Sequence, residues 1–291
     1  MKLALKVDVD TFRGTSEGVP RLVELFRRHG AGATFLFSLG PDHTGRALKR
    51  VFRPGFFSKV QRTSVVEHYG LKTLLYGTLL PGPDIGSRCA ATLRSVRDAG
   101  FEVGIHCWDH VRWQDGVADA QAAWTEREMK LSLERFSAIF HVEARTFGAA
   151  GWQTNRHAAW VEEQRFDYAS DTRGRFPFLP LWNGVRIGCP QLPTTLPTLD
   201  ELIGLEEDPV AHLLEKTKSG THHVFTAHAE LEGAKLLPAF ASLLEGWKRQ
   251  GYELVSMREY FGSLDAANLP KCEVVYGEIA GRSGTLALQG A

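Results

Sequence analysis

Short apolar runs alternate with longer amphipathic segments from one end of the chain to the other. The apolar runs are short enough for buried strands, which are predicted at 3–9, 33–38, 101–105, 145–147, 168–170, 223–227 and 253–256. The longer segments predict helices at 19–29, 85–99, 120–140 and 234–250. Because strands that alternate with helices form parallel sheets, the pattern predicts an α/β fold, either open or closed into a barrel.

Candidate chemistry gathers where the predicted strands end. The side chains at or just after these ends are Asp8, Asp10, His106, Ser170, Asp171 and His228. In α/β barrels the rim formed by the carboxyl ends of the strands carries the active site. We therefore expect these side chains to share one site.

The segment 46–83 interrupts the alternation between the second predicted strand and the following helix. It carries seven basic residues and one acid, interleaved with aromatic residues and leucines. Such a segment suits a surface that lies on anionic lipid headgroups, so it predicts contact with a membrane. The alternative is a basic helix whose charged face is solvated and whose other face packs on the core.

Composition narrows the class of protein. The chain has 291 residues, 43% of them hydrophobic, and its 34 basic and 34 acidic side chains give a formal net charge of zero. This balance excludes a protein that coats nucleic acid by bulk charge, and the hydrophobic content excludes disorder. The chain shows no internal repeat and no flexible linker. Residues 1–291 are therefore expected to form one domain that carries the insertion.

The spacing of the cysteines and the length of the apolar runs indicate in which cellular compartment the protein works. No Cys-x-x-Cys pair occurs, which argues against a zinc ribbon or a thioredoxin-like motif and suits a reducing compartment. The first apolar run is too short for a signal-peptide core, and no run reaches the ~18 apolar residues that a spanning helix needs. We expect a cytoplasmic protein whose membrane contact is peripheral.

Asp8 and Asp10 are two residues apart on a predicted strand, so both carboxylates point to the same face. Two crowded carboxylates repel each other, and a cation beside them relieves that cost. One of them can then bind a metal while the other takes protons. The alternative is a surface turn with two solvated acids.

His106 and His110 have the spacing that places two imidazoles on one face of a helical turn. Two histidines and an aspartate can hold one metal ion and leave positions open for water, as a catalytic site requires. The alternative is a pair of half-buried histidines on a packed turn. Ligand type and placement beside the Asp pair favour the metal.

His228 and Asp171 end two further strands. An aspartate that orients a histidine fixes the tautomer of the ring and tunes its pKa for proton transfer. With a metal to activate water, a carboxylate to take its proton and a histidine to protonate a leaving amine, the residues predict metal-assisted hydrolysis of an amide.

These motifs resemble the polysaccharide deacetylase family, also called the NodB-homology family. The resemblance implies a distorted (β/α) barrel, with Asp8 as the base and Asp10, His106 and His110 as metal ligands. The last family motif is similar to the stretch around His228, and an intermediate motif resembles 167–171. One divalent ion is implied, and the ligands suit Zn, Co, Mn or Ni alike.

Further stretches resemble one branch of that family, in the same order along nearly the whole chain. They lie at 7–14, 17–21, 105–110, 149–152, 170–174, 226–230 and 279–282. This branch implies release of formate from 4-deoxy-4-formamido-L-arabinose on undecaprenyl phosphate, in lipid A modification and polymyxin resistance. The enzyme would act at the cytoplasmic face of the inner membrane. Within or beside these stretches, we expect the substrate to meet Trp152, Arg173, Glu230 and Arg13.

One stretch departs from the family pattern. The third motif of the family begins with an arginine that pairs with the catalytic aspartate, whereas Gly148 begins the matching stretch here. Asp8 therefore needs another cation, and Arg145, Arg173 and Arg13 are the candidates.

Three rival functions remain open. The first is a deacetylase of another N-acylated sugar, and the second is a phosphatase of the haloacid dehalogenase type. The motif of these phosphatases has Thr or Val at the position where this chain has Phe12, and their mechanism gives no role to His106 and His110. The third is a protein that binds the lipid-linked sugar with a decayed site, which the missing arginine motivates.

Overall fold

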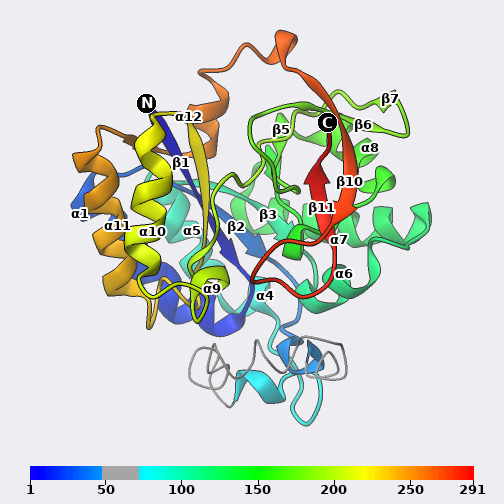
Figure 1. The fold of residues 1–291 in the computed structure, drawn as a ribbon. Helices are drawn as coiled ribbons and strands as arrows, with labels where there is room; N and C mark the ends of the chain where they lie inside the picture. Colours follow the sequence, from blue (N-terminus) through cyan, green and yellow to red (C-terminus); the bar gives the residue numbers. More distant parts are fainter. Residues whose placement is uncertain (48–71) are drawn as a thin grey trace.

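A curled parallel sheet forms the centre of the computed structural model, which describes residues 1–47 and 72–291. Its strands lie in the order β5-β4-β3-β2-β1-β8, and β9 pairs with the first half of β1 (Figure 1). All of these pairings are parallel. The strands are β1 (Lys2–Val9), β2 (Thr34–Ser38), β3 (Glu102–Cys107), β4 (Thr146–Phe147), β5 (Tyr168–Ala169), β8 (His223–His228) and β9 (Glu253–Val255).

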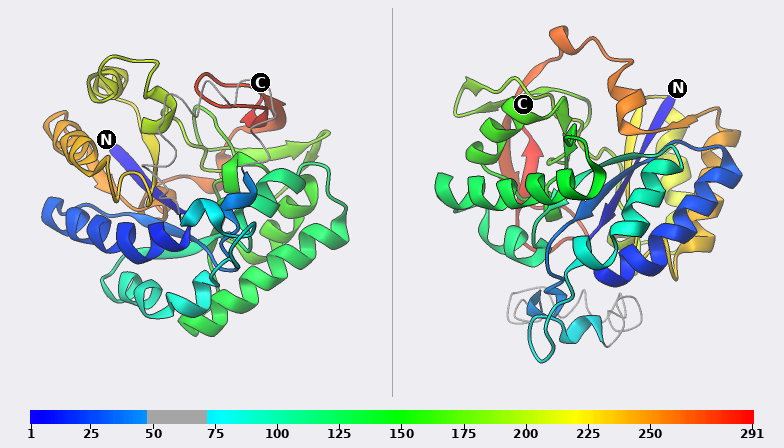
Figure 2. Two further views of the ribbon diagram at one scale, coloured as in Figure 1. Left: turned by 90° about the horizontal axis from the view of Figure 1, so that it is seen from below. Right: turned by 180° about the vertical axis from the view of Figure 1, so that it is seen from behind.

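Helices cover the outside of this curled sheet (Figure 2). Neighbouring helices contact one another in the order α10, α11, α1, α5, α7 and α8, so they form a continuous outer layer. The α-helices are α1 (Val19–His29), α4 (Ile85–Arg88), α5 (Ala90–Asp98), α6 (His110–Gly116), α7 (Ala122–Phe140), α8 (Arg156–Arg165), α9 (Leu199–Leu202), α10 (Pro209–Lys216), α11 (Leu237–Arg249) and α12 (Met257–Phe261). No helix among the described residues combines the length and apolar character needed to cross a bilayer.

Burial explains why the two central strands form where they do. Every residue of β2 and all but the first residue of β1 are buried, as the short apolar runs require. Between these strands, α1 has Pro20 in its first turn and ends at Gly30, whose φ of 58° lies in the left-handed region. The rings of Phe26, Phe35 and Phe240 pack edge to face between sheet and helices.

The predicted fold class, an α/β barrel of the polysaccharide deacetylase type, is confirmed. Two predicted boundaries are wrong. The segment predicted as one helix over 85–99 is divided at Cys89, whose φ of −108° and ψ of 11° are not helical. The strand predicted over 101–105 continues to Cys107, so it contains His106.

A second sheet, which the apolar pattern does not predict, packs beside the first. Its order is β11-β10-β6-β7, with β6 (Leu179–Trp182), β7 (Val185–Arg186), β10 (Lys271–Gly277) and β11 (Leu286–Gln289). Arg173 forms backbone bridges to Thr194 and Leu288, which tie this sheet to the stretch after β5. The chain between β10 and β11 is thereby held near the ends of the main strands.

The insertion lies between β2 and α4, where the sequence places it. Residues 48–71 are outside the described part of the chain, so the structure describes only the two ends of the predicted 46–83 segment. At these ends, Gly45 N–H donates to the carbonyl of Tyr76, and the Arg46 side chain donates to the carbonyl of Gly77. The two flanks therefore meet where the insertion leaves the barrel.

Close packing at Gly18 gives a first prediction, because a Cβ there would overlap the carbonyl of Ala229, the residue after His228. Gly18→Ala is expected to lower the free energy of unfolding by about 1–3 kcal/mol, as overpacking does. Gly116→Ala is the matched control: a Cβ at Gly116 would meet nothing nearer than Trp124 at 3.5 Å. Urea unfolding measures both, and equal stabilities of the two variants would contradict the packing argument.

Candidate metal centre and active site

Asp10, His106 and His110 form a cluster at the carboxyl ends of β1 and β3. Asp10 Oδ1 lies 3.2 Å from His106 Nε2, and Asp10 Oδ2 lies 3.3 Å from His110 Nε2. One ligand atom from each of the three residues lies within 4.8 Å of the others. This spacing allows all three to contact a single ion.

The backbone orients the two histidines in different ways. His106 belongs to β3, and its Nδ1 lies 2.6 Å from the carbonyl of Gly148, so Nδ1 donates and Nε2 is left as the ligand atom. His110 opens α6, whose N-terminus is capped by Asp109, which accepts from Arg112 N–H. The expectation that both histidines share a helical turn is wrong: a strand end and a helix start bring their rings to 5.3 Å.

The chemistry of this cluster fits a divalent cation. Asp10 Oδ1 is buried and accepts no hydrogen bond from the described residues. Burial raises the pKa of Asp10, but His110 and His106 outweigh that effect and hold its pKa well below its usual range. A buried carboxylate that stays ionised beside two imidazole nitrogens is a suitable donor set for Zn, Co, Mn or Ni.

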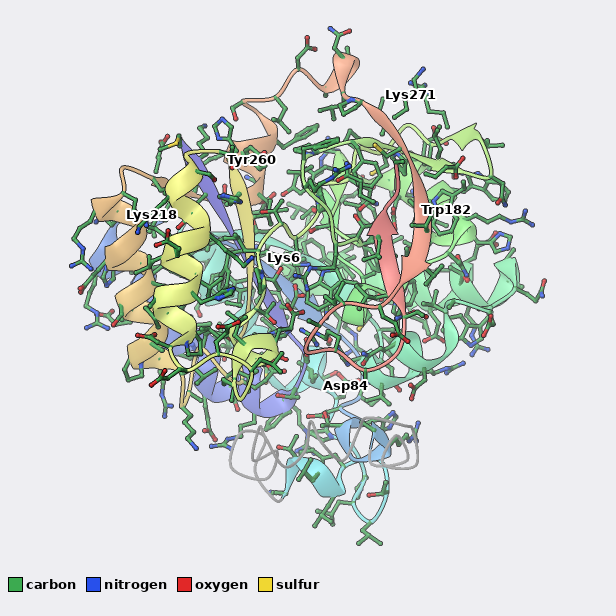
Figure 3. The ribbon with its side chains drawn as sticks, viewed as in Figure 1. Lys6, Asp84, Trp182, Lys218, Tyr260 and Lys271 are labelled. Carbon is green, nitrogen blue, oxygen red and sulfur yellow. The ribbon has the colours of Figure 1, made fainter. Side chains whose placement is uncertain are left out.

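Asp8 lies beside the cluster with a lysine as its cation. Lys6 Nζ is 3.4 Å from Asp8 Oδ2 and donates to the carbonyl of Ser170. Figure 3 shows Lys6 in the interior of the molecule, unlike Lys218 and Lys271 at its periphery. The described ion pairs of the three candidate arginines are elsewhere: Arg145 with Asp167, Arg173 with Glu201, and Arg13 with Glu17.

Sequence reasoning missed Lys6, although a signal for it exists. Lys6 and Asp8 are two residues apart on β1, so the alternation of strand side chains puts both on one face, and Asp10 follows at the same spacing just after the strand ends. A lysine on the same face as two acids, within a strand expected to be buried, is the cation that Asp8 needs.

His228 faces Asp8 from the neighbouring strand. β1 and β8 are paired in parallel with Asp8 opposite His228, and His228 is 8% exposed. The described carboxylate beside its ring is that of Asp200, whose Oδ1 lies 3.7 Å from His228 Nδ1. Asp200 lies in the first turn of α9, so no strand-end pattern could have predicted it.

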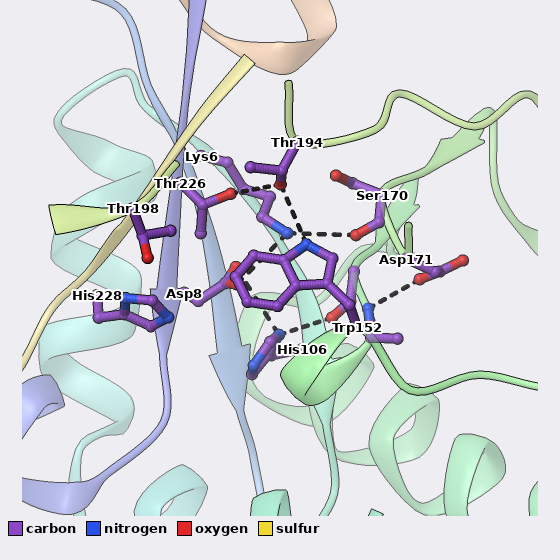
Figure 4. A network of polar contacts seen from close by, with 12 residues as sticks. Lys6, Asp8, His106, Trp152, Ser170, Asp171, Thr194, Thr198, Thr226 and His228 are labelled. Atoms are coloured by element: carbon purple, nitrogen blue, oxygen red, sulfur yellow. Dashed lines mark hydrogen bonds and ion pairs between the residues drawn. The ribbon is translucent and has the colours of Figure 1, made fainter. Parts of the chain in front are cut away.

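Asp171, predicted as the residue that orients His228, has other contacts. Its carboxylate accepts from Ala149 N–H and from the side chain of Gln191. Figure 4 shows Asp171 and His228 on opposite sides of Trp152. Burial raises the pKa of Asp171 against the hydrogen bonds from Gln191 and Ala149, which favour the carboxylate. Asp171 therefore contacts the loop around Ala149 in this structure.

Trp152 lies at the centre of the remaining predicted residues. Its ring is 6.3 Å from that of His228, and the guanidinium groups of Arg173 and Arg282 lie 4.9 and 4.6 Å from the ring centroid. Both arginines contact Oε1 of Glu201. Arg282 comes from the β10–β11 connection, so the second sheet contributes to the site.

Glu230 and Arg13 differ in their surroundings. Glu230 is buried with no hydrogen bond to its carboxylate from the described residues, and burial together with Asp10 raises its pKa well above the usual range. Gly14 leaves room for it, since a Cβ there would lie 2.5 Å from Glu230 Oε2. The Arg13 side chain is 36% exposed and pairs with Glu17 at 3.2 Å. Their predicted contact with substrate stays a prediction.

Solved structures show which known proteins share this fold. A Mycobacterium smegmatis protein described as a "putative polysaccharide deacetylase" matches with a TM-score of 0.64 and 17% identity, covering 96% of this chain and 94% of that one. A structure described as Puue allantoinase matches with a TM-score of 0.60 and 13% identity, covering 90% of this chain and 89% of that chain. No protein-family model matches the chain. The chain thus shares the fold of the polysaccharide deacetylase class.

Curated relatives identify the family within that class. A Shewanella sediminis protein named "Probable 4-deoxy-4-formamido-L-arabinose-phosphoundecaprenol deformylase ArnD" is 37% identical over 99% of this chain and 94% of its own length. A Wigglesworthia glossinidia brevipalpis protein with the same name is 30% identical over 95% of this chain and 98% of its own length. The chain belongs to the ArnD deformylase family. The resemblance that the sequence motifs carry is thereby confirmed.

Glu201 gives a prediction on stability and pH. Burial raises its pKa, but Arg282 and Arg173 outweigh burial and lower it below the ordinary value of 4.5. Its stabilising contribution is therefore complete above about pH 4.5 and is lost as the pH falls through the lower pKa of the folded state. Glu201→Gln is expected to cost about 3 kcal/mol at pH 7, because it removes the carboxylate that the buried Arg173 shares with the partly buried Arg282.

Urea unfolding from pH 7 down to pH 3 measures this cost, and the difference between the natural protein and Glu201→Gln should shrink below pH 4.5. Glu215→Gln is the matched control, since Glu215 pairs with Lys218 at the surface and its side chain is 70% exposed. A difference that grows on acidification would contradict the assignment.

Proposed function

We propose that this protein is a metal-dependent deformylase. It removes the N-formyl group from 4-deoxy-4-formamido-L-arabinose linked to undecaprenyl phosphate and releases formate. The observation that carries the proposal is the cluster of Asp10, His106 and His110, with Asp8 and His228 beside it on paired strands. Support for the substrate comes from the names of the two relatives, which match along nearly the whole chain.

Asp10, His106 and His110 hold the divalent cation in this proposal. When bound, the cation supplies Lewis-acid chemistry: it polarises the formyl carbonyl and makes water a better nucleophile at neutral pH. The ligand atoms contributed by the chain are a carboxylate oxygen of Asp10 and Nε2 of each histidine.

Asp8 and His228 move the protons. Asp8 takes a proton from the attacking water at Oδ1, which is buried and has no hydrogen bond from the described residues. His228 gives a proton to the departing amine from Nε2, while Nδ1 faces Asp200. The two residues stand opposite each other in the β1–β8 register, so they can reach one amide from two sides.

The role of the enzyme in the cell follows from this substrate. Deformylation exposes the amine of aminoarabinose, which is then used to modify lipid A and confers polymyxin resistance. Because undecaprenyl phosphate stays in the bilayer, we place the protein in the cytoplasm, bound peripherally to the inner membrane. Nucleic acid is not a partner in this proposal.

Replacing the proton-transfer residues tests the mechanism. Asp8→Asn and His228→Ala are each expected to lower kcat for formate release by about 100-fold or more, because each removes one general acid–base step. Their bound metal, measured by elemental analysis, should stay as in the natural protein. Full deformylation by either variant with metal retained would refute its assigned role.

Replacing the histidine ligands tests the metal centre separately. His106→Ala and His110→Ala are expected to lose bound divalent metal, because each leaves only two protein ligands. His212→Ala is the control, since His212 pairs with Glu206 away from the cluster. Unchanged metal content in both ligand variants would show that the ligand set is wrong.

The products separate this function from its rivals. Release of acetate from an N-acetyl sugar in preference to formate would indicate a deacetylase of another sugar. Phosphate release from an aryl phosphate would indicate the phosphatase. Binding of the undecaprenyl lipid without metal and without formate release would indicate a binding protein.

We propose that the 46–83 segment contacts the membrane. Its described end supports this, since Leu79 is 81% exposed and Leu80 is 36% exposed next to it. The basic residues of the segment include Arg46 and Lys72, which flank the undescribed part. Apolar side chains near basic ones suit an anionic bilayer surface.

Sedimentation with anionic vesicles tests this contact. The affinity of the double variant Leu79→Ser/Leu80→Ser for the vesicles is expected to fall by roughly tenfold or more, because two leucines no longer enter the bilayer interface. Val142→Ser is the matched control, since Val142 is 54% exposed but lies between α7 and β4. Equal binding of both variants and the natural protein would refute the contact.

A further inference from the structure

We propose that Lys6 is a positioning residue for Asp8, holding Oδ2 so that Oδ1 is the oxygen that accepts the proton of the attacking water. This inference rests on the proposed function, in which Asp8 is the base. Neither the motifs nor the comparisons assign a role to Lys6.

The burial of Lys6 is the first observation. Its side chain is 0% exposed, although lysine is rarely buried without a partner. Nζ lies 3.4 Å from Asp8 Oδ2 and 3.2 Å from the carbonyl oxygen of Ser170, and it stands 5.4 Å from the centroid of the Trp152 ring. A carboxylate, a carbonyl and an aromatic face together compensate the ammonium for the loss of water.

The two oxygens of Asp8 differ because of this contact. Oδ2 faces the ammonium, whereas Oδ1 is buried without a hydrogen bond from the described residues. Nδ1 of His106 lies 3.8 Å from Oδ1, but that nitrogen donates to the carbonyl of Gly148 at 2.6 Å. Oδ1 is therefore left with an unused acceptor capacity beside the metal cluster.

Gly148 lies next to the ammonium of Lys6. A Cβ at this position would lie 3.7 Å from Lys6 Nζ and would overlap Cδ1 of Leu36. A larger side chain here would compete with Lys6 for the same space. Gly148 thus lies beside two groups of the site: its carbonyl accepts from His106 Nδ1, and the side that lacks a Cβ faces Lys6.

Lys6 also joins distant parts of the sheet. It lies on β1, while Ser170 follows β5, an edge strand that three strands separate from β1 in the order β5-β4-β3-β2-β1-β8. The contact spans the hollow of the curled sheet, as Figure 4 shows for Lys6, Ser170 and Asp8. The ammonium is therefore bound both to the strand that carries Asp8 and to the residue after β5.

A double-variant cycle separates positioning from general stability. kcat and KM for formate release are measured for the natural protein, Lys6→Met, Asp8→Asn and the double variant. Lys6→Met alone should lower kcat by about 100-fold, the size of a general-base contribution. KM should change by less than about threefold, because substrate binding is retained. Bound metal should stay at the natural level.

The double variant gives the sharpest readout. If Lys6 acts only through Asp8, adding Lys6→Met to Asp8→Asn causes no further loss of kcat. Lys2→Met is the matched control, since Lys2 lies on the same face of β1 but its ammonium contacts the carbonyl of Glu259. This control should keep the natural kcat.

Several results would overturn the inference. They are an unchanged kcat in Lys6→Met, loss of metal in that variant, or a loss in the double variant that multiplies the two single losses. Should Lys6→Met fail to fold, the double variant removes both buried charges, and a further loss of its kcat below that of Asp8→Asn would still overturn the inference.

The same data distinguish this inference from the proposed function. If the natural protein releases no formate, the proposed function fails and the inference falls with it. If the natural protein releases formate and Asp8→Asn does not, but Lys6→Met does at the natural rate, only the inference fails.

Discussion

The parallel pairing of β1 with its two neighbours is the constraint on which the site depends. β1 carries Lys6 and Asp8 on one face, with Asp10 directly after its end, and its register with β8 places Asp8 opposite His228. Its register with β2 and the pairing of β2 with β3 bring His106 to the same rim. A shift of one residue in β1 would turn these side chains to the opposite face of the sheet.

Buried charged groups are the second feature on which the site depends. Several carboxylates lie at the rim, and the surrounding residues stabilise them by different contacts. Asp8 has Lys6, and Glu201 has Arg173 and Arg282. Glu232 accepts the backbone N–H of His228, and burial raises its pKa to about 8. Asp10 keeps a depressed pKa among the histidines, so it is the acid best prepared for a divalent cation.

Much of this architecture could be predicted from the sequence, because the signals are local. Strands such as β1 and β2 are buried throughout, so their apolar runs are visible without knowledge of the fold. The motif residues stand at strand ends, and parallel strands bring those ends together. The resemblance to a known family then assigned roles that the spacing alone left open.

The rest depends on contacts between distant segments. β7 has two residues, too few for a periodic pattern, and the second sheet forms only when residues after 270 return to the barrel. Asp200 reaches His228 from the first turn of α9, and Arg282 reaches Trp152 from the β10–β11 connection. The prediction that His106 and His110 share a helical turn is wrong because a four-residue spacing also fits a strand end followed by a helix start.

The central claim is that a divalent ion at Asp10, His106 and His110 enables hydrolysis of the formamide. The most direct measurement is formate release from undecaprenyl-phosphate-linked formamido-arabinose by protein stripped of metal with a chelator, before and after one divalent metal is added back. The account predicts loss of formate release on stripping and recovery at about one metal per chain. Undiminished formate release by metal-free protein would contradict it.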